Sequence, residues 1–367
     1  MSKFTESIVE EACLEYFKAL DYQYFPGPEI ASDGLFAERS GYGDVLLRRR
    51  LRDALVKINP TIPATAIDDA VKQVAKTDSP TAIINNRAFH KLVTEGVDVQ
   101  FRRDGRVVTD KVWLFDWDNL KNNDWLVVNQ FTVHENHVNR RPDIVVFING
   151  IPIATIELKN PADENATVRS AYNQLQTYKA QIPSLFTYNE LLIISDGHEA
   201  KLGGLTSDWE RFTPWRTIDG ENIVPPECPQ METLIKGVFQ KHIILDLIRH
   251  FIVFEEDAGK ITKIVSAYHQ YHAVNKAVIT LNISRIMSFG SMESFLYSQS
   301  ESPLPRPVTL GTFEEGVEEP NGPSEGSDSG ALPSLAGVLP QDDQSAVAFP
   351  GNCGRHSILI GYCRAIS

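Results

Sequence analysis

Residues 140–161 read RRPDIVVFINGIPIATIELKNP, and this stretch decides the fold. Two runs rich in Ile and Val flank an Asn-Gly pair at 149–150, the dipeptide that favours a two-residue hairpin turn. We therefore expect two strands joined by a tight turn. Side chains two apart on a strand share a face, so Glu157 and Lys159 point the same way, away from their apolar neighbours. Asp143 lies near the start of the first strand, and the turn brings it close to the other two charges.

This set of charges suits phosphodiester cleavage. Carboxylates hold Mg²⁺, which polarises a phosphoryl oxygen and lowers the pKa of an attacking water, and a lysine beside them stabilises the negative charge that develops. Asp143 and Glu157 are the expected metal ligands, with the Leu158 backbone carbonyl as a third, and Lys159 would orient water or stabilise the transition state. The alternative is that these are solvent-facing charges on an edge hairpin. The D…ExK spacing alone leaves both interpretations open.

The chain around the hairpin alternates between helical and β-rich patterns. Short β-rich runs begin at Val97 and are separated by turn dipeptides such as Asp-Gly at 104–105. An amphipathic helix over about 166–181 and the apolar run ELLIISDG at 190–197 follow the hairpin, as in a crossover that returns to the same sheet. This order predicts an α/β fold in which a mixed β-sheet is flanked by helices. Further helices are expected over 5–20, 43–58, 64–76 and 80–95.

A second unit is predicted after the sheet. Residues 230–276 carry apolar residues at helical spacing and are expected to be helical. From 277 to 367 the chain has no lysine, four arginines and ten acidic residues, and it is rich in Ser, Pro and Gly. That composition is typical of a disordered segment. The predicted divisions of the chain are therefore 1–228, 229–276 and 277–367.

The overall composition narrows the class of protein. A net charge of −13 argues against a diffuse basic surface for nucleic acid, so any DNA contact must be local or assisted by a partner. No run approaches the roughly 18 apolar residues of a membrane span, and the acidic start MSKFTESIVEEACLEYF is unlike a secretory signal. We therefore expect a cytoplasmic protein without membrane contact. The four cysteines lack CxxC spacing, which argues against a thiolate zinc site.

A further motif follows the hairpin. The helix expected over 166–181 contains NQLQTYK, which places Gln174 and Tyr178 four residues apart and hence on one face. Hairpin, spacing and helix together fit the PD-(D/E)xK nuclease pattern. From about residue 1 to 276 the chain resembles the N-terminal nuclease region of the restriction (R) subunit of type I restriction endonucleases. In that family a PDxxxFxNGxPxxxxExK stretch precedes a QxxxY motif, and here PDIVVFINGIPIATIELK and QLQTY fill every position.

The resemblance implies catalytic roles for the three hairpin charges and a supporting role, near the metal or the DNA, for Gln174 and Tyr178. It also implies a further acidic residue from the first helix, Glu6 or Glu10, and the sequence leaves that choice open. The implied activity is Mg²⁺-dependent cleavage of double-stranded DNA, with a specificity subunit and a modification methyltransferase as partners. Two other interpretations stay open: a catalytically idle remnant that only binds partners, and a free-standing PD-(D/E)xK nuclease of DNA repair.

Members of that family continue into a helicase-like motor that hydrolyses ATP. Residues 268–278, YHQYHAVNKAV, resemble the segment just ahead of the phosphate-binding loop of the motor, where Gln270 would contact adenine. No GxxxxGK[ST] loop follows in this sequence. We therefore expect a chain that is truncated before the motor, without ATP hydrolysis, and in which Gln270 is a vestige.

Overall fold

The computed structural model describes residues 6–160 and 167–281. The disordered segment predicted for 277–367 therefore lies almost wholly outside the described residues. Within the described part of the chain, no helix combines the length and the apolar character that a membrane crossing requires.

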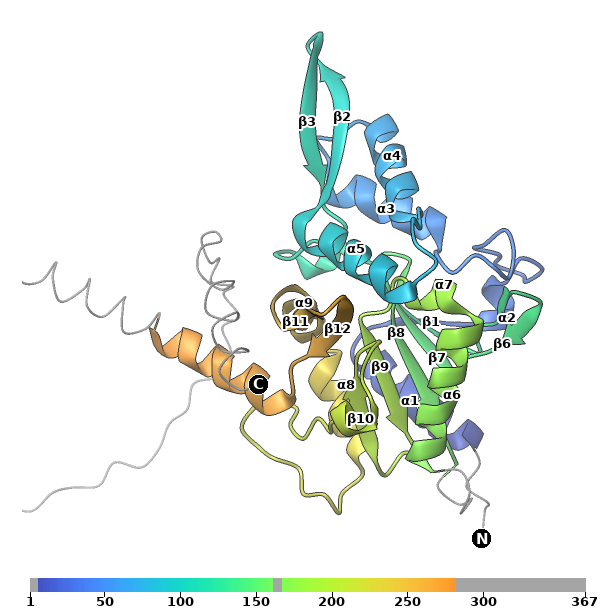
Figure 1. The fold of residues 1–367 in the computed structure, drawn as a ribbon, viewed down its shortest axis with the longest axis vertical. Helices are drawn as coiled ribbons and strands as arrows, with labels where there is room; N and C mark the ends of the chain where they lie inside the picture. Colours follow the sequence, from blue (N-terminus) through green and yellow to red (C-terminus); the bar gives the residue numbers. More distant parts are fainter. Residues whose placement is uncertain (1–5, 161–166, 282–367) are drawn as a thin grey trace, which may run out of the picture. The chain divides into compact units, whose positions relative to one another are not determined.

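The centre of the molecule is a six-stranded sheet (Figure 1). In order across the sheet, the strands are β1 (Gln23–Pro26), β4 (Trp125–Asn129), β7 (Ile144–Ile148), β8 (Ile151–Leu158), β9 (Leu191–Ser195) and β10 (Ala200–Gly203). Strand β1 runs parallel to β4, and β8 runs parallel to β9, whereas the other neighbouring pairs are antiparallel. The mixed sheet predicted from the sequence is confirmed.

Strands β7 and β8 form the predicted hairpin, and its turn is the Asn-Gly pair. Asn149 and Gly150 both have positive φ, 54° and 74°, the combination that matches the twist of a two-residue hairpin. The Asn149 side chain also donates to the Leu114 carbonyl at 2.8 Å and accepts from the Asp124 amide at 2.6 Å. These bonds tie the turn to the segment ahead of β4, so the position of the hairpin in the sheet is fixed at its turn.

Replacing Gly150 by alanine is expected to destabilise the protein by about 2 kcal/mol or more. A Cβ here would lie 2.5 Å from the Leu47 carbonyl oxygen and 2.9 Å from the Leu51 amide nitrogen, at a φ that side chains rarely adopt. Chemical denaturation measures the loss. Gly105→Ala is the matched control, because Gly105 has a φ of 76° but open space around it, and it should cost only about 1 kcal/mol. Equal losses in both variants would contradict the role of close packing at Gly150.

Helices cover both faces of the sheet. Helix α6 (Val168–Gln181) lies in front of it and α1 (Glu6–Ala19) behind it (Figure 1), and both contact β8. Every residue of β8 is buried as a result. Its proline, Pro152, coincides with a register shift in the β7–β8 pairing, so the missing amide falls where the ladder is irregular. The other helices are α2 (Gly27–Ile30), α3 (Arg48–Ile58), α4 (Ala64–Val74), α5 (Ala82–Glu95), α7 (Pro183–Phe186), α8 (Gln230–Val238) and α9 (Lys241–His250).

The helical prediction for 230–276 is right at its start and wrong in its middle. Helices α8 and α9 form, but the next segment is a hairpin of β11 (Ile252–Asp257) and β12 (Lys260–Val265). Ala258 and Gly259 at its turn have φ of 47° and 80°. A glycine between runs of alternating β-branched residues is a hairpin signal that helical spacing alone overlooks. A helix resumes at 268 and runs to 281, the last described residue.

Two more hairpins lie outside the main sheet. Strands β2 (Val97–Arg103) and β3 (Arg106–Val112) form a hairpin that projects beyond the sheet (Figure 1). Strands β5 (Val133–Glu135) and β6 (Val138–Arg140) form a short one beside α6.

Helix α8 packs against α1, so the segment after 229 shares a core with the sheet region. The rings of Phe17 and Phe239 meet edge to face with centroids 4.9 Å apart, and the Tyr22 hydroxyl donates to the Phe239 carbonyl at 3.0 Å. The described residues up to Val278 consequently form one compact unit. The division predicted between 228 and 229 refers to the architecture of longer family members and stays a prediction.

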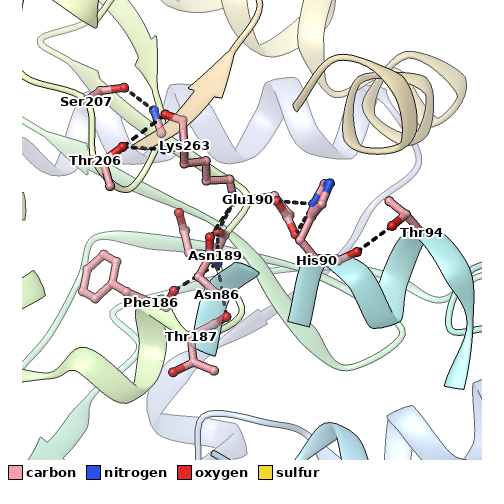
Figure 2. A network of polar contacts seen from close by, with 11 residues as sticks. Asn86, His90, Thr94, Phe186, Thr187, Asn189, Glu190, Thr206, Ser207 and Lys263 are labelled. Atoms are coloured by element: carbon pink, nitrogen blue, oxygen red, sulfur yellow. Dashed lines mark hydrogen bonds and ion pairs between the residues drawn. The ribbon is translucent and has the colours of Figure 1, made fainter. Parts of the chain in front are cut away.

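A buried polar network joins the β11–β12 hairpin to the sheet (Figure 2). Lys263 on β12 is 1% exposed, and its amine donates to Asn86 Oδ1 at 3.0 Å, to the Asn189 carbonyl at 2.8 Å and to Glu190 Oε2 at 2.5 Å. All three partners are acceptors, so the amine carries three protons and the pair is ionised. Burial alone would raise the pKa of Glu190, but Lys263 and His90 bring it below its ordinary value.

Candidate active site

The β7–β8 hairpin places Asp143 beside the end of β8. Asp143 directly precedes β7, and Ile144 pairs with Ile156 in the ladder. The Asp143 Oδ2 atom accepts a hydrogen bond from the Leu158 amide at 2.8 Å, so the carboxylate is anchored to the strand that carries Glu157. The predicted proximity of these positions is confirmed.

Glu157 and Lys159 form an ion pair at the edge of the core. The Lys159 amine donates to Glu157 Oε1 at 3.0 Å and to the Leu158 carbonyl oxygen at 2.8 Å. Glu157 is fully buried and the Lys159 side chain is 12% exposed. The Lys159 amide donates to the Ser195 carbonyl at 2.9 Å, which holds this residue against the end of β9. The backbone of two neighbouring strands therefore fixes where the charges lie.

The chemistry of these donors fits a hard divalent cation. Mg²⁺ prefers oxygen ligands, and Asp143, Glu157 and the Leu158 carbonyl offer carboxylate and backbone oxygens. The Lys159 ammonium already lies between Glu157 Oε1 and the Leu158 carbonyl, so two of these oxygens converge on a position that a cation occupies. Among the residues that the structure describes, no cluster of three or more His, Cys, Asp or Glu side chains could hold a metal. The set here is instead two carboxylates and one backbone oxygen.

The structure brings Glu10, from the first helix, to this region. Its carboxylate accepts from Asn129 Nδ2 at 2.6 Å and from Gln130 Nε2. The backbone N–H of Gln130 donates to the Asp143 carbonyl at 2.8 Å, so Gln130 links helix α1 to the residue that precedes β7. Burial, and then the charges of Glu10 and Asp143, raise the pKa of the buried Cys13 thiol far above its ordinary value. The side chain of Glu6, the other candidate, lies outside the described part of the chain.

Asn129 and Gln130 are part of the observed site but not of the site predicted from the sequence. In the sequence, residues 124–135 (DWLVVNQFTVHE) form one β-rich run, whereas the structure ends β4 at Asn129 and gives Gln130 a φ of 52°. Two adjacent amide side chains inside the apolar run WLVVNQF are the signal that could have marked this break. Their side chains donate hydrogen bonds to the Glu10 carboxylate. The change of backbone direction at Gln130 therefore helps to position Glu10.

Gln174 and Tyr178 lie on one face of α6, as predicted. Gln174 Nε2 donates to the Tyr178 hydroxyl at 2.6 Å, and that hydroxyl donates to the Arg141 carbonyl at 3.5 Å. Burial, and then the charges of Glu157 and Asp143, raise the pKa of Tyr178 far above its ordinary value. The tyrosine therefore stays protonated close to both carboxylates.

Gln270 has a local contact at the start of the last described helix. Its Oε1 atom accepts from the Ala267 amide at 3.0 Å, as a side chain does when it caps a helix. The adenine contact is what the family resemblance implies, and the expectation that Gln270 is a vestige in this chain stays a prediction.

Comparison with known proteins decides the family. The family model described as type I restriction enzyme R protein N terminus matches residues 3–211, more than half of the chain. The chain belongs to this family. The matched range of the R protein N terminus contains the hairpin charges, Glu10, Gln174 and Tyr178, whereas Gln270 lies beyond it.

Curated relatives of this R protein N terminus carry consistent names. The type I restriction enzyme HindI endonuclease subunit of Haemophilus influenzae is 38% identical over 278 residues, covering 74% of this chain and 26% of that protein. The putative type I restriction enzyme MjaIXP endonuclease subunit of Methanocaldococcus jannaschii is 33% identical over 290 residues, covering 74% and 27%. The chain thus spans about a quarter of the length of these relatives.

Proposed function

We propose that this chain cuts double-stranded DNA by Mg²⁺-dependent hydrolysis, as the restriction subunit of a type I restriction-modification complex, with a PD-(D/E)xK core as its cutting centre. The observation that carries the proposal is the meeting of Asp143, Glu157 and Lys159 at the end of one hairpin. The relatives named as endonuclease subunits support the same activity.

Each residue of the hairpin has a chemical role in this proposal. Asp143, Glu157 and the Leu158 carbonyl would hold the ion, which when bound would supply Lewis acidity toward a phosphoryl oxygen and lower the pKa of an attacking water. Lys159 places a positive charge beside the phosphate, where negative charge grows in the transition state. Hydrolysis then breaks one phosphorus–oxygen bond of the backbone. The water oxygen joins phosphorus, and a proton passes to the departing oxygen.

The surrounding residues position this centre. Asn129 and Gln130 hold the Glu10 carboxylate next to the Asp143 segment, and we assign Glu10 a supporting role toward the hydrated ion. We assign a supporting role next to the bound DNA to the buried Tyr178 hydroxyl and to Gln174, which donates a hydrogen bond to it. Within the complex, a specificity subunit would recognise the DNA sequence, and a modification methyltransferase would be the remaining kind of subunit.

Chelation is expected to abolish cleavage by this chain. The full chain is incubated with supercoiled plasmid in Mg²⁺, in EDTA, and in EDTA followed by excess Mg²⁺, alone and with the specificity and methyltransferase subunits. Nicked circles should form with Mg²⁺, be absent in EDTA and return with excess Mg²⁺, because the carboxylates need the ion to act on phosphate. Cleavage that resists EDTA would contradict the metal assignment. No cleavage in any of the mixtures would contradict the proposed function.

A further inference from the structure

An open pocket lies beside the candidate active site. Its volume is about 520 Å³. One wall is the end of β6 and the residue after it, with Asn139, Arg140 and Arg141, and the other wall is α6, with Asn173 and Thr177 beside the two residues of the QxxxY motif. The pocket therefore adjoins the proposed cutting centre, but five of its residues have no part in the chemistry described above.

The lining is cationic and rich in hydrogen-bond donors. Among the residues that the structure describes, the lining contains two arginines, amides and hydroxyls, and no carboxylate, in a chain whose net charge is −13. Arg140 is braced by its Nε atom, which donates to Gln181 Oε1 on α6. The Arg141 side chain is exposed, and the described residues record no ion pair for it. Such a pocket suits an anion that accepts several hydrogen bonds at once.

The pocket also lies close enough to Asp143 to contact a phosphate next to the reacting one. Arg141 precedes Asp143 by two residues, and two extended residues span at most about 7 Å. The Tyr178 hydroxyl bonds to the Arg141 carbonyl, which connects α6 to this segment. Successive phosphates of a DNA strand follow one another about every 3.4 Å along the helix axis. A strand whose reacting phosphate lies at Asp143 therefore carries a neighbouring phosphate past Arg141.

We infer that this pocket binds a backbone phosphate next to the cleaved bond, with Arg141 as the main contact and Asn173 and Thr177 as further donors. The inference rests on the proposed function, because DNA is the substrate that supplies the phosphate. A guanidinium fork matches two phosphate oxygens at once. Contacts to phosphate set the register of a strand but read no sequence. The pocket is thus the local basic site that an acidic chain needs in order to touch DNA.

Binding of a fluorescent duplex by the full chain tests this inference. It is measured in Mg²⁺ over a range of salt concentrations, in an Asp143→Asn background that keeps the DNA intact. Arg141→Ala should weaken binding at low salt by about tenfold and reduce the slope of log K against log salt by about 0.9, the loss of one phosphate contact. Arg141→Lys should retain the slope, because the charge remains, while binding more weakly than arginine.

Arg106→Ala is the matched control. It removes the same charge from the exposed tip of the β2–β3 hairpin, away from α6 (Figure 1), and should leave the slope unchanged. An unchanged slope in Arg141→Ala, or an equal fall in Arg106→Ala, would overturn the inference. The inference would also be overturned if millimolar inorganic phosphate binds at Arg141 while Arg141→Ala has no effect on DNA binding. That outcome would favour a site for free phosphate.

Failure here is distinguishable from failure of the proposed function. If the Arg141→Ala chain with Asp143 intact cuts DNA with an unchanged KM and salt slope, the pocket assignment is wrong and the nuclease stands. If Arg141→Ala lowers the slope but no Mg²⁺-dependent cleavage occurs in any protein, the pocket is a nucleic-acid site and the nuclease assignment is wrong.

Discussion

Asp143→Asn is expected to lower the rate of DNA cleavage by about 10³-fold while leaving the protein folded and able to bind DNA. Asparagine keeps an oxygen that can accept from the Leu158 amide, a bond of 2.8 Å in the structure, so the β7–β8 geometry should persist. What disappears is a negative charge at the end of the hairpin that carries Glu157, and with it one of the proposed anionic ligands for the ion. Initial rates of plasmid nicking in excess protein measure the effect, and thermal unfolding checks the fold.

Asp53→Asn is the control for this variant. Asp53 lies on α3 with its side chain 66% exposed and only a 3.9 Å contact to Arg49, so the same substitution there should leave the cleavage rate unchanged. Equal cleavage by wild type and Asp143→Asn would sink the catalytic assignment. A variant that loses cleavage together with its unfolding transition would show that Asp143 serves the fold instead.

Lys263→Met is expected to lower the free energy of unfolding by about 3–5 kcal/mol. The substitution leaves Glu190 ionised and fully buried without the ammonium that approaches it at 2.5 Å, and it leaves Asn86 Oδ1 without its donor (Figure 2). The Asn189 carbonyl loses one of two donors and keeps the bond from Asn86 Nδ2 at 2.8 Å. Removing one partner of a buried pair costs more than the pair contributes, because the remaining charge stays out of water. Denaturant unfolding with unchanged m-value measures this loss.

Two comparisons separate this effect from a general loss of charge. Lys72→Met removes an ammonium from a surface pair with Asp69 whose lysine side chain is 74% exposed, and it should cost at most about 1 kcal/mol. Adding Glu190→Gln to Lys263→Met should recover part of the stability, since no buried charge remains. Equal losses for Lys263→Met and Lys72→Met would contradict the buried ion pair.

The cost of Lys263→Met should also depend on pH. In the wild type, the pKa of Glu190 is below its ordinary value, so its contribution is present above the pKa of the unfolded chain and is lost as the pH falls through the folded value. Without the ammonium, burial raises the pKa of Glu190, and the carboxyl takes up a proton in mild acid. The difference between variant and wild type should therefore be smaller near about pH 4 than near about pH 7.

Local signals predict the hairpin and the meeting of its charged residues well. The Asn-Gly pair sets the turn, and the two-residue period of a strand then places Glu157 and Lys159 together and Asp143 opposite the end of β8. These are short-range relations, so they can be obtained from adjacent letters of the sequence. The same holds for Gln174 and Tyr178, whose proximity follows from the rise of one helical turn.

Long-range relations could not be obtained in this way. The hydrogen bond between Glu10 and Gln130 joins positions 120 residues apart, and neither segment contains a sequence signal that predicts contact with the other. Lys263 reads as a surface charge in sequence, because lysine is rarely buried without a partner, and its partner Glu190 lies in another element. The hairpin at 252–265 is a short-range feature that the prediction misses for a different reason, because apolar residues within short segments fit a helix as well as a strand.

The amine of Lys159 bears on how the oxygens of the candidate active site are held. It bridges Glu157 Oε1 and the Leu158 carbonyl, so contacts within the protein itself position two of the proposed metal ligands, whereas small zinc domains fold only when their metal binds. A divalent ion at the proposed site would share these oxygens with the ammonium. Under the proposed function, a chelator should therefore stop the reaction without unfolding the protein.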